Sequence, residues 1–346
     1  MSASVSVKHV ASRAGVSLGT VSNVLNRPER VSLVTRERVL AAIDELGFVR
    51  NEAARQLRAG QSRTIGLLVL DVGNPFFTDI AAGVEHAAAV AGLSVVLCNS
   101  GENADREDHY LSLLQEQRAY GILVTPVTER YAHIEEIRKS GTPTVLVDRG
   151  SSRRQCSVSV NDVEGGELAV AHLLAQGHER IAFAGGPFKI NQVADRLAGM
   201  RNAYRVAGVS DAKLVLIETD TLKVAGGRDA GARIIGMPPR RRPTAVFCGN
   251  DLVALGLLQE LTRQHVSVPG EIAIVGYDDI DFAGAAAVPL TSIRQPRSQL
   301  GQAATELLIE EVSAPETHRH RQVVFEPELV VRASSDLRVG KRRPSP

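Results

Sequence analysis

The chain has 346 residues, is 44% hydrophobic and carries a net charge of only +1. It is too long for one average domain and apolar enough to bury a large core, so we expect two or three globular units. No apolar run approaches the roughly 18 residues of a membrane span, and the start lacks the apolar region of a secretory signal. We therefore predict a cytoplasmic protein without membrane contact.

The charge is distributed unevenly along the chain. The first 63 residues hold ten Lys and Arg against five Asp and Glu, a net charge of +5, so the remainder is acidic by about −4. Lys and Arg that neutralise phosphates supply most of the sequence-independent affinity for DNA. The asymmetry indicates an anion-binding N-terminal unit, and on charge alone a merely solvated basic surface is the alternative.

Residues 1–50 are predicted to form a small all-α unit of three short helices. The first has an apolar stripe on one face, formed by Val7, Val10, Ala11 and Ala14. Gly15 breaks this pattern, and Ser17 is a good N-cap for a second helix from 18 to 26. Ser32 is the expected N-cap of a third helix, which ends before Gly47.

The second helix has a small, polar outer face. Its apolar residues point one way, and the opposite side carries Gly19, Ser22, Asn23 and Asn26. An α-helix fits the major groove of DNA, where an amide can pair bidentately with adenine, so Asn23 is the leading candidate for reading a base. Serine and asparagine on an exposed helix are also ordinary, and that is the alternative for each residue taken alone.

Residues 51–62 are predicted to be a hinge helix or linker. The stretch from 51 to 60 contains good helix formers with little apolar surface, and so short a helix is marginal in water by itself.

From Thr64 apolar runs alternate with helical segments, which is typical of βαβ units and parallel sheets. Strands are expected at 65–70, 93–98, 121–125, 144–147, 156–160, 181–184, 245–248 and 272–275. A last helix at about 299–312 precedes one predicted strand at 323–331. We expect two lobes within 63–338: an N-lobe of about 63–161 plus 294–324, and a C-lobe of about 162–293 plus 325–338. Residues 339–346 are predicted to be a disordered tail.

Ligands of open α/β sheets bind beyond the carboxyl ends of the strands. Candidates at those ends are Asp71, Asn99, Thr125, Asp148, Asn250 and Asp278. Polar groups from two lobes suit a polyhydroxylated ligand, with Phe76 as an aromatic face against its ring. Alternatively, Asn250 only caps the following helix, Asp71 only closes a strand, and Phe77 is a core residue.

Several function classes lack their signatures in this chain. Cys98, Cys156 and Cys248 lie far apart beside apolar runs, so we expect free, buried thiols. The chain has no GxGxxG turn, Walker sequence, GxSxG elbow or metal-spaced Cys/His group. We predict no cofactor, no metal site and no catalysis, and a transporter's solute-binding protein fits poorly with a basic N-terminal unit.

Several strings in the chain resemble the lactose-repressor/galactose-repressor family, in a shared order over nearly its whole length. They are VASRAGVSLGTVSNVLN at 10–26, VSLVTRERV at 31–39, ELGFVRNEAARQL at 45–57, DVGNPFF at 71–77, GHER at 177–180, GND at 249–251 and GYDD at 276–279. The resemblance implies a helix-turn-helix headpiece joined to a two-lobed, periplasmic-binding-protein-like α/β domain.

The resemblance also implies roles for individual residues. In the headpiece, bases would be contacted by Leu18, Gly19 and Asn23, and phosphates by Thr20, Ser22 and Asn26, while Ser17 contacts the backbone and caps the helix. In the hinge helix, Leu57 would enter the minor groove, accompanied by Asn51, Arg55 and Arg58. Effector contacts would include Asp148, Arg196, Asn250 and Asp278.

Three departures from the family pattern concern the headpiece. Gly19 offers no side chain, and Asn23 stands where a basic residue is frequent, so the operator sequence stays open. His9 replaces the acid that would complete a capping box with Ser6, which predicts a weakly held first turn.

We therefore predict a transcriptional regulator that binds double-stranded DNA. One headpiece contacts few base pairs, so a homodimer on a palindromic operator is expected, and the polar tail cannot supply a leucine heptad for a tetramer. Repression relieved by a small-molecule effector is the favoured mode, with a corepressor-dependent regulator or an activator as alternatives. Aromatic residues make up 4% of the chain and tryptophan is absent, which favours a sugar over a large stacked ligand, although a purine stays open.

Overall fold

The computed structural model describes residues 5–48, 62–128, 131–150 and 155–336. The chain divides into two compact units, 1–61 and 62–346, which we describe separately. The predicted hinge contacts and the predicted disordered tail lie outside the described residues. No helix in the described part of the chain is long and apolar enough to cross a membrane.

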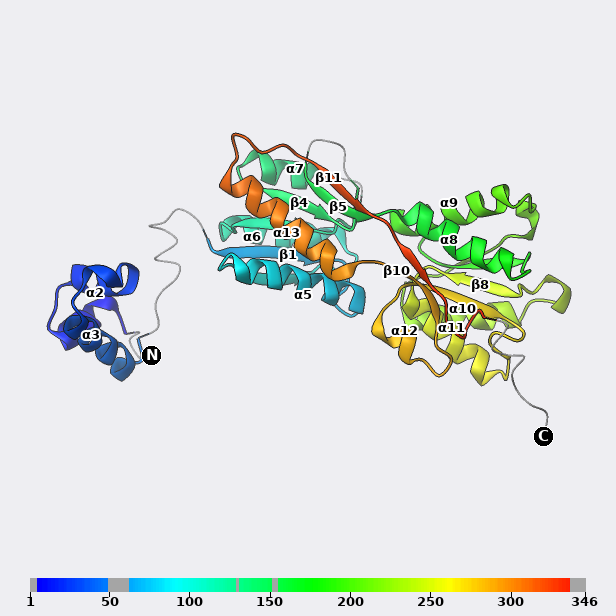
Figure 1. Ribbon diagram of the computed structural model, residues 1–346, viewed down its shortest axis with the longest axis horizontal. Coiled ribbons are helices and arrows are strands. Elements are labelled where there is room, and N and C mark those ends of the chain that lie inside the picture. Colours follow the sequence, from blue (N-terminus) through cyan, green and yellow to red (C-terminus); the bar gives the residue numbers. More distant parts are fainter. Residues whose placement is uncertain (1–4, 49–61, 129–130, 151–154, 337–346) are drawn as a thin grey trace. The chain divides into compact units, whose positions relative to one another are not determined.

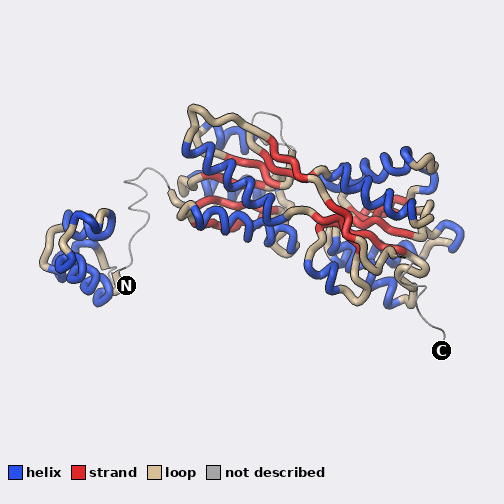
Figure 2. Tube along the Cα trace, viewed as in Figure 1, coloured by secondary structure: helices blue, strands red, loops and turns tan. Residues whose placement is uncertain are grey.

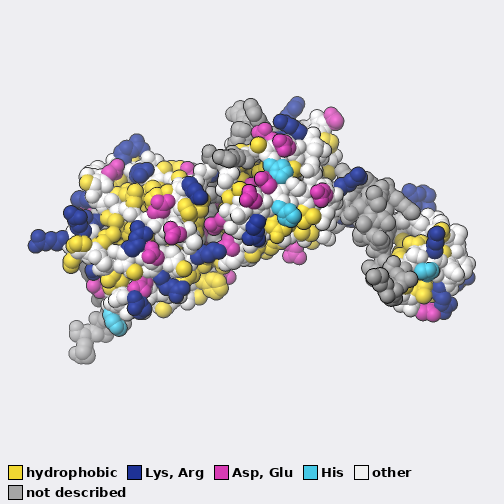
Figure 3. Space-filling model, turned by 180° about the vertical axis from the view of Figure 1, so that it is seen from behind, with side chains coloured by type: hydrophobic (Ala, Val, Ile, Leu, Met, Phe, Trp, Pro, Cys, Tyr) yellow, Lys and Arg dark blue, Asp and Glu magenta, His cyan; other side chains and the backbone are white. Residues whose placement is uncertain are grey.

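The first unit is a bundle of the three predicted helices, α1 (Val7–Ala14), α2 (Leu18–Asn26) and α3 (Leu33–Leu46), with a 3-10 turn at Pro28–Arg30. Its small core consists of Val10, Ala11, Ala14, Val21, Val24, Val39 and Ala42. Gly15 and Gly47 end α1 and α3 at φ angles of +62° and +59°, a region that glycine enters without steric cost. On the face drawn in Figure 3, this unit shows more Lys and Arg than acidic side chains.

The start of α1 differs from expectation. Nδ1 of His9 accepts a hydrogen bond from the Ser6 backbone N–H at 3.2 Å, so the imidazole occupies the place of the missing carboxylate. An acceptor nitrogen therefore satisfies an N–H at the helix N-terminus that the sequence appeared to leave unpaired.

In the second unit, the N-lobe is built on a parallel sheet in the order β11-β5-β4-β3-β1-β2. Its strands are β1 (Thr64–Val69), β2 (Ser94–Asn99), β3 (Gly121–Val124), β4 (Thr144–Val147), β5 (Ser157–Val160) and β11 (Gln322–Phe325). Helices α5 (Pro75–Val90) and α13 (Arg297–Ser313) cover one face, and α6 (Ala104–Glu116) and α7 (Ala132–Lys139) cover the other. Successive strand residues point to opposite faces, so Leu67 packs under α5 and Leu68 under α6.

The C-lobe has a second sheet in the order β12-β10-β9-β8-β6-β7, parallel except for β12. Its strands are β6 (Ile181–Gly185), β7 (Val215–Glu218), β8 (Ala245–Cys248), β9 (Ala273–Asp278), β10 (Thr291–Arg294) and β12 (Glu328–Val330). Helices α8 (Asp162–Ala175) and α9 (Asn191–Val206) cover one face. The other face is covered by α10 (Val224–Ile235) and α11 (Asp251–Arg263), with the short α12 (Asp281–Ala285) at its edge. Figure 2 shows both sheets enclosed by helices. Short 3-10 turns occur at Asp211–Lys213 and Pro239–Arg241.

The described chain passes between the lobes three times: between β5 and α8, between β10 and α13, and between β11 and β12 (Figure 1). The prediction of one strand at 323–331 is wrong, because β11 and β12 belong to different sheets. Pro327 lies between them and has no backbone N–H to continue a ladder. Arg294 belongs to the second sheet and Phe325 to the first, each one residue from the predicted lobe boundary.

All three cysteines are free and buried, as predicted.

Candidate functional site

The N-terminus of α2 is well capped. Oγ of Ser17 accepts the backbone N–H of Thr20 at 3.1 Å and lies 3.0 Å from the Thr20 hydroxyl. Ser17, Leu18 and Gly19 are all exposed, so the first turn presents backbone N–H groups and a hydroxyl to solvent. Such a turn is favourable for an approaching phosphate.

The outer face of α2 matches the small polar surface inferred from the sequence. Asn23 and Asn26 are exposed, Thr20 and Ser22 are half-buried, and Val21 and Val24 are buried against the other helices. Nδ2 of Asn26 donates to the Ser22 carbonyl at 2.9 Å, which holds this amide along the helix. Asn23 is therefore better placed than Asn26 to reach outward. The hinge candidates Asn51, Arg55, Leu57 and Arg58 lie outside the described residues and stay predictions.

Six of the eight candidate effector residues line one cavity between the two lobes, whereas Asn99 and Thr125, although they follow strands, are not part of its lining. Asp71, Phe76 and Asp148 come from the N-lobe, and Arg196, Asn250 and Asp278 come from the C-lobe. The cavity encloses about 50 Å³. Ligand pockets usually enclose roughly 300–1,000 Å³, so the lobes must separate further to admit a ligand.

Arg196 on α9 is the buried centre of this site. Its Nε donates to Oδ1 of Asp162 at 2.8 Å, and its Nη1 donates to the Gly249 carbonyl at 2.6 Å. The guanidinium lies 3.7 Å from the ring centroid of Tyr277, within range of a cation–π interaction, and 4.0 Å from Asp278. Although burial lowers the pKa of Arg196, Asp162 and the neighbouring acidic groups raise it above its usual value.

Carboxyl groups outnumber cations in the lining of the cavity. Asp71, Glu102, Asp148 and Asp278 face a single arginine. Burial, reinforced by Asp162, raises the pKa of Asp148 to about 8, and burial raises the pKa of Asp278 to about 6 against the opposing effect of Arg196. The site therefore has an excess of carboxyl groups, and at neutral pH Asp148 is largely protonated, with one donor and one acceptor oxygen.

Asp148 and Asp278 are also held in an unusual backbone conformation. Their φ angles are +56° and +103°, a region that costs an L-residue free energy and that clusters at functional sites. Oδ1 of Asp278 accepts from Gln295 at 2.7 Å. Oδ2 of Asp148 accepts from Gln192 at 3.1 Å, whereas Oδ1 of Asp148 is buried without a hydrogen-bond partner in the described structure.

Two contacts join the lobes across the cavity. Nζ of Lys223 lies 3.1 Å from Oδ2 of Asp71, and Nε2 of Gln192 donates to the Asp148 carbonyl at 2.8 Å. In each pair one residue belongs to each lobe, so these contacts must rearrange if the lobes move apart.

Asn250 acts as a helix cap as well as lining the cavity. Its Oδ1 accepts the Val253 N–H at 2.9 Å, and its Nδ2 donates to the Leu222 carbonyl at 3.0 Å. Phe76 and Phe77 pack edge to face with centroids 5.0 Å apart, and both belong to the N-lobe core and to the cavity wall. The core and ligand interpretations of these phenylalanines are therefore compatible.

Sequence reasoning missed several residues of this site. Asn74, Glu102, Gln192, Ile190 and Leu222 line the cavity, and Asp162 pairs with Arg196. Gln192 stands one helical turn before Arg196 on α9, and this i, i+4 spacing is the one local signal that could have identified it.

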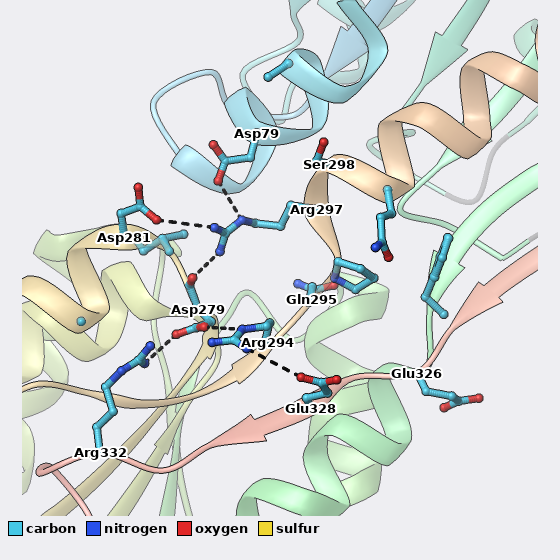
Figure 4. Close-up of a pocket in the computed structure, with 16 residues that line it drawn as sticks. Asp79, Asp279, Asp281, Arg294, Gln295, Arg297, Ser298, Glu326, Glu328 and Arg332 are labelled. Atoms are coloured by element: carbon cyan, nitrogen blue, oxygen red, sulfur yellow. Dashed lines mark hydrogen bonds and ion pairs between the residues drawn. The ribbon is translucent and has the colours of Figure 1, made fainter. Parts of the chain in front are cut away.

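A larger cavity of about 840 Å³ lies elsewhere at the junction of the lobes (Figure 4). Its arginines are ion-paired: Arg297 with Asp79 at 2.7 Å, and Arg294 and Arg332 with Asp279 at 2.8 and 2.6 Å. Figure 4 shows Arg297 between Asp79 of α5 and Asp281 of α12. We interpret it as an interlobe ion-pair network, because its three arginines are paired with carboxylates, and the smaller cavity is the candidate ligand site.

Comparison with known proteins identifies the family. A profile of bacterial regulatory proteins of the lacI family matches residues 6–51, and one of periplasmic binding protein-like domains matches residues 170–335. The HTH-type transcriptional repressor PurR of Photobacterium profundum is 36% identical over 330 residues, covering 95% of this chain and 98% of the relative. The ribose operon repressor of Escherichia coli is 36% identical over 332 residues, covering 95% and 99%. The chain belongs to the lacI family of bacterial regulatory proteins.

Solved structures agree with this lacI-family assignment. The lac repressor dimer bound to operator and the anti-inducer ONPF has a TM-score of 0.82 at 26% identity, covering 96% of this chain and 99% of that one. A lacI-family regulator of Enterococcus faecium with bound ribose has a TM-score of 0.72 at 30% identity, covering 79% and 98%. The predicted fold class and the prediction of a DNA-binding transcriptional regulator are confirmed, and the named relatives are repressors rather than enzymes.

Proposed function

We propose that this lacI-family protein binds a palindromic operator as a homodimer, represses transcription there, and is released by a neutral sugar bound between its lobes. In this proposal the protein works in the cytoplasm by binding alone, without a catalytic step. The lac repressor structure is a dimer on its operator, and the named relatives are repressors, which supports this mode.

The observation that carries the sugar assignment is the surplus of carboxyl groups around Asp148. Its Oδ1 has no partner in the described structure, and three further carboxyl groups line the same cavity. A buried carboxyl oxygen without a partner costs free energy in either protonation state, and a ligand hydroxyl, which both donates and accepts, can supply the missing partner. Sugar hydroxyls donate hydrogen bonds in several directions, so a polyol satisfies such a site well.

The same surplus disfavours anionic ligands. Asp71 and Glu102 would repel a phosphate, and Lys223 is already paired with Asp71. The ribose-bound Enterococcus faecium regulator and a CelR regulator with cellobiose are structural neighbours that hold neutral sugars. We therefore place a neutral monosaccharide or short oligosaccharide ahead of a sugar phosphate or a purine base.

For the switch, we propose that the ligand changes the angle between the lobes and thereby the pairing of the two headpieces. The Lys223–Asp71 and Gln192–Asp148 contacts join the lobes at the cavity. A ligand shifts this equilibrium only if it binds the two lobe arrangements with different affinity.

The test uses the full-length protein and an operator selected from a random duplex library. Operator affinity is measured by fluorescence anisotropy with and without ribose, other pentoses, hexoses, cellobiose, hypoxanthine and guanine. We expect a palindromic site, no effect of the purines, and a tenfold or greater loss of affinity with one sugar. A gain of affinity would instead indicate a corepressor, and a response to purines alone would overturn the sugar assignment.

Asp148→Asn sharpens this test. Above pH 8, where Asp148 is ionised, the substituted amide offers one acceptor and one donor group in place of two acceptor oxygens, so sugar affinity should fall there while operator affinity without sugar is retained. Asp229→Asn on α10 is the matched control, because Asp229 is exposed and does not line the cavity. Equal sugar affinity in the wild type and Asp148→Asn at that pH would refute the role of this carboxylate.

A further inference from the structure

Four metal-binding side chains meet at one end of the N-lobe, away from the interlobe cavity. Cys156 stands just before β5, Glu311 lies in the last turn of α13, and His318 and His320 lie in the segment between α13 and β11. One ligand atom from each of the four lies within 4.8 Å of all the others. The sequence alone predicts no metal site, because Cys156 is more than 150 residues from its partners.

The individual distances are close to those of a tetrahedral metal centre. Sγ of Cys156 is 3.1 Å from Nε2 of His318 and 3.7 Å from Nδ1 of His320. Oε2 of Glu311 is 4.0 Å from each of these two nitrogens. With Zn–S near 2.3 Å and Zn–N or Zn–O near 2.1 Å, tetrahedral ligand atoms are separated by roughly 3.3–3.6 Å. The separations lie within about an ångström of these values, so modest side-chain movements would complete the geometry.

The cluster is largely buried, with His320 the most exposed of its side chains at 28%, and one of its carboxylate oxygens has no hydrogen-bond partner among the described residues. Cys156 is fully buried, and the His318 side chain is only 2% exposed. Oε2 of Glu311 is buried without a hydrogen-bond partner in the described structure. A buried carboxylate oxygen directed at a thiol and two imidazoles is costly unless a cation or a donor reaches it.

The two imidazoles have different neighbours: His318 lies near a carboxylate, whereas His320 accepts a hydrogen bond from an arginine. Nδ1 of His318 lies 3.5 Å from Oε1 of Glu310 without a hydrogen bond in the described structure, so a small approach of this carboxylate would be needed to orient the imidazole as in known metal sites. Nη2 of Arg138 lies 3.1 Å from Nε2 of His320 and donates to it. If Nδ1 of His320 binds a metal, the ring proton is on Nε2, and Nε2 can no longer accept a hydrogen bond from Arg138. The Arg138 side chain must therefore move away when metal binds.

We propose that Cys156, Glu311, His318 and His320 form a site for a divalent transition-metal ion, with Zn²⁺ as the best-fitting ion. One thiolate, two imidazoles and a carboxylate match the donors that zinc prefers, whereas Mg²⁺ and Ca²⁺ prefer oxygen ligands alone. Four protein ligands leave no open position, which is typical of a structural site.

The position of the site indicates which segments of the N-lobe a bound metal would join. Cys156 precedes β5, whereas Asn161, at the other end of that strand, begins the crossing into the C-lobe, about 16 Å away at ~3.3 Å per residue. A bound metal would fasten the segment between α13 and β11 to β5. Because β11 leads directly into the crossing to β12, the metal would hold one end of an interlobe connection.

The test uses full-length protein without a histidine tag, stripped of metal with a chelator and then titrated with Zn²⁺ or Co²⁺. We expect one ion per chain. Co²⁺ should produce the thiolate-to-metal charge-transfer absorption and the intense visible bands of tetrahedral cobalt. Saturation with Zn²⁺ at about 100 times Kd should raise the Tm by roughly 4–5 °C.

Single substitutions test which side chains bind the metal. Cys156→Ser should remove the charge-transfer band, and His318→Ala should weaken binding at least tenfold. Cys98→Ser, which removes another buried thiol of the same lobe, is the matched control and should keep both the band and the affinity. Arg138→Gln should bind Zn²⁺ more tightly than the wild type, because its amide oxygen can accept the Nε2 proton of His320.

These results also separate this site from the sugar site. The Cys156→Ser protein should still bind sugar, since Cys156 does not line the interlobe cavity. Failure of the wild type to bind either ion, or a cobalt spectrum without thiolate ligation, would overturn the proposal. So would unchanged binding in both Cys156→Ser and His318→Ala.

Discussion

The outer face of α2 and the interlobe cavity are both rich in polar groups, but they hold them in opposite environments. Ser17, Leu18 and Asn23 are exposed on α2, where water satisfies any group that has no protein partner. Asp148, Arg196 and Asp278 are at most 5% exposed, and each depends on a few fixed protein contacts. The exposed face of α2 therefore costs little folding free energy when DNA is absent. The buried polar groups of the cavity do cost free energy wherever a partner is missing.

This difference predicts how each region responds to substitution. An exposed side chain that reads DNA can be removed with little effect on folding, because no buried group loses its partner. A charge in the cavity cannot be removed so simply, since its neighbours stay buried. Stability and binding should thus change together in the cavity and separately on α2.

The largest effect is expected for Arg196→Met. The substitution fills similar space but leaves Asp162, Asp148 and Asp278 without their cation, and breaking a buried ion pair on one side costs about 3–5 kcal/mol. Urea unfolding should show this loss in the free energy of unfolding of the second unit. Arg233→Met is the matched control, because Arg233 is half-exposed and pairs with the exposed Asp229, and it should cost about 0–1 kcal/mol. Similar losses in both variants would contradict the comparison.

The second effect concerns pH. A carboxyl whose pKa is higher in the folded than in the unfolded protein stabilises the fold at acidic pH, and this contribution is lost as the pH rises through the folded pKa. For Asp148 this contribution is lost between about pH 4, its pKa in the unfolded chain, and about pH 8, its pKa in the folded protein. The wild type should therefore lose stability relative to Asp148→Asn between pH 5 and 8.5, by at least about 1.4 kcal/mol, the value of one pKa unit.

Asp278→Asn provides an internal comparison for that measurement. The pKa of Asp278 is about 6, so its contribution to the free energy of unfolding is lost at lower pH than that of Asp148. The difference in stability between Asp278→Asn and the wild type should therefore stop changing near pH 7. The measurement is urea unfolding of the three proteins at several pH values, which gives the free energy of unfolding of each as a function of pH. Parallel pH profiles for the wild type and both variants would show that these carboxyls titrate as they do in the unfolded chain.

The two regions also differ in what the sequence could predict. The face of α2 depends on local periodicity, so its helix and its exposed residues were predictable. The cavity residues at the ends of strands were predictable from the parallel-sheet pattern, because carboxyl ends of parallel strands share one edge. Gln192 and Asp162 were not predicted, since their roles arise only when α8 and α9 pack beside Asp148 and Arg196.

The missed strand β10 has a related cause. Thr291 and Ser292 are fully buried but polar, so a search for apolar runs passes over them. Their hydroxyls are satisfied by distant residues: Ser292 donates to Asp251 at 2.7 Å, and Thr291 bonds with Ser335 at 2.7 Å. Burial of a polar strand requires such partners, and their positions come from the tertiary structure.

On α2, Asn23→Ala should leave the stability of the headpiece unchanged within about 0.5 kcal/mol. Its effect should appear in DNA binding as a loss of about 1–3 kcal/mol of discrimination at one base position, measured by anisotropy on a panel of single-base operator variants. Asn26→Ala is the control, and it should weaken binding to all these operators alike, as a phosphate contact does. A uniform loss for Asn23→Ala would remove it as a base reader.

The smallest effect separates the two roles of Ser17. Its hydroxyl caps α2 by accepting the Thr20 N–H, and loss of such a cap to alanine costs about 1 kcal/mol, whereas glycine at the same position costs only a few tenths. Ser17→Ala should therefore lower the stability of the headpiece more than Ser17→Gly does, as measured by thermal unfolding. Both variants lack the hydroxyl, so a direct phosphate contact would reduce their operator affinities equally. If the hydroxyl acts only as a cap, affinity should follow stability, and Ser17→Gly should bind the operator nearly as tightly as the wild type.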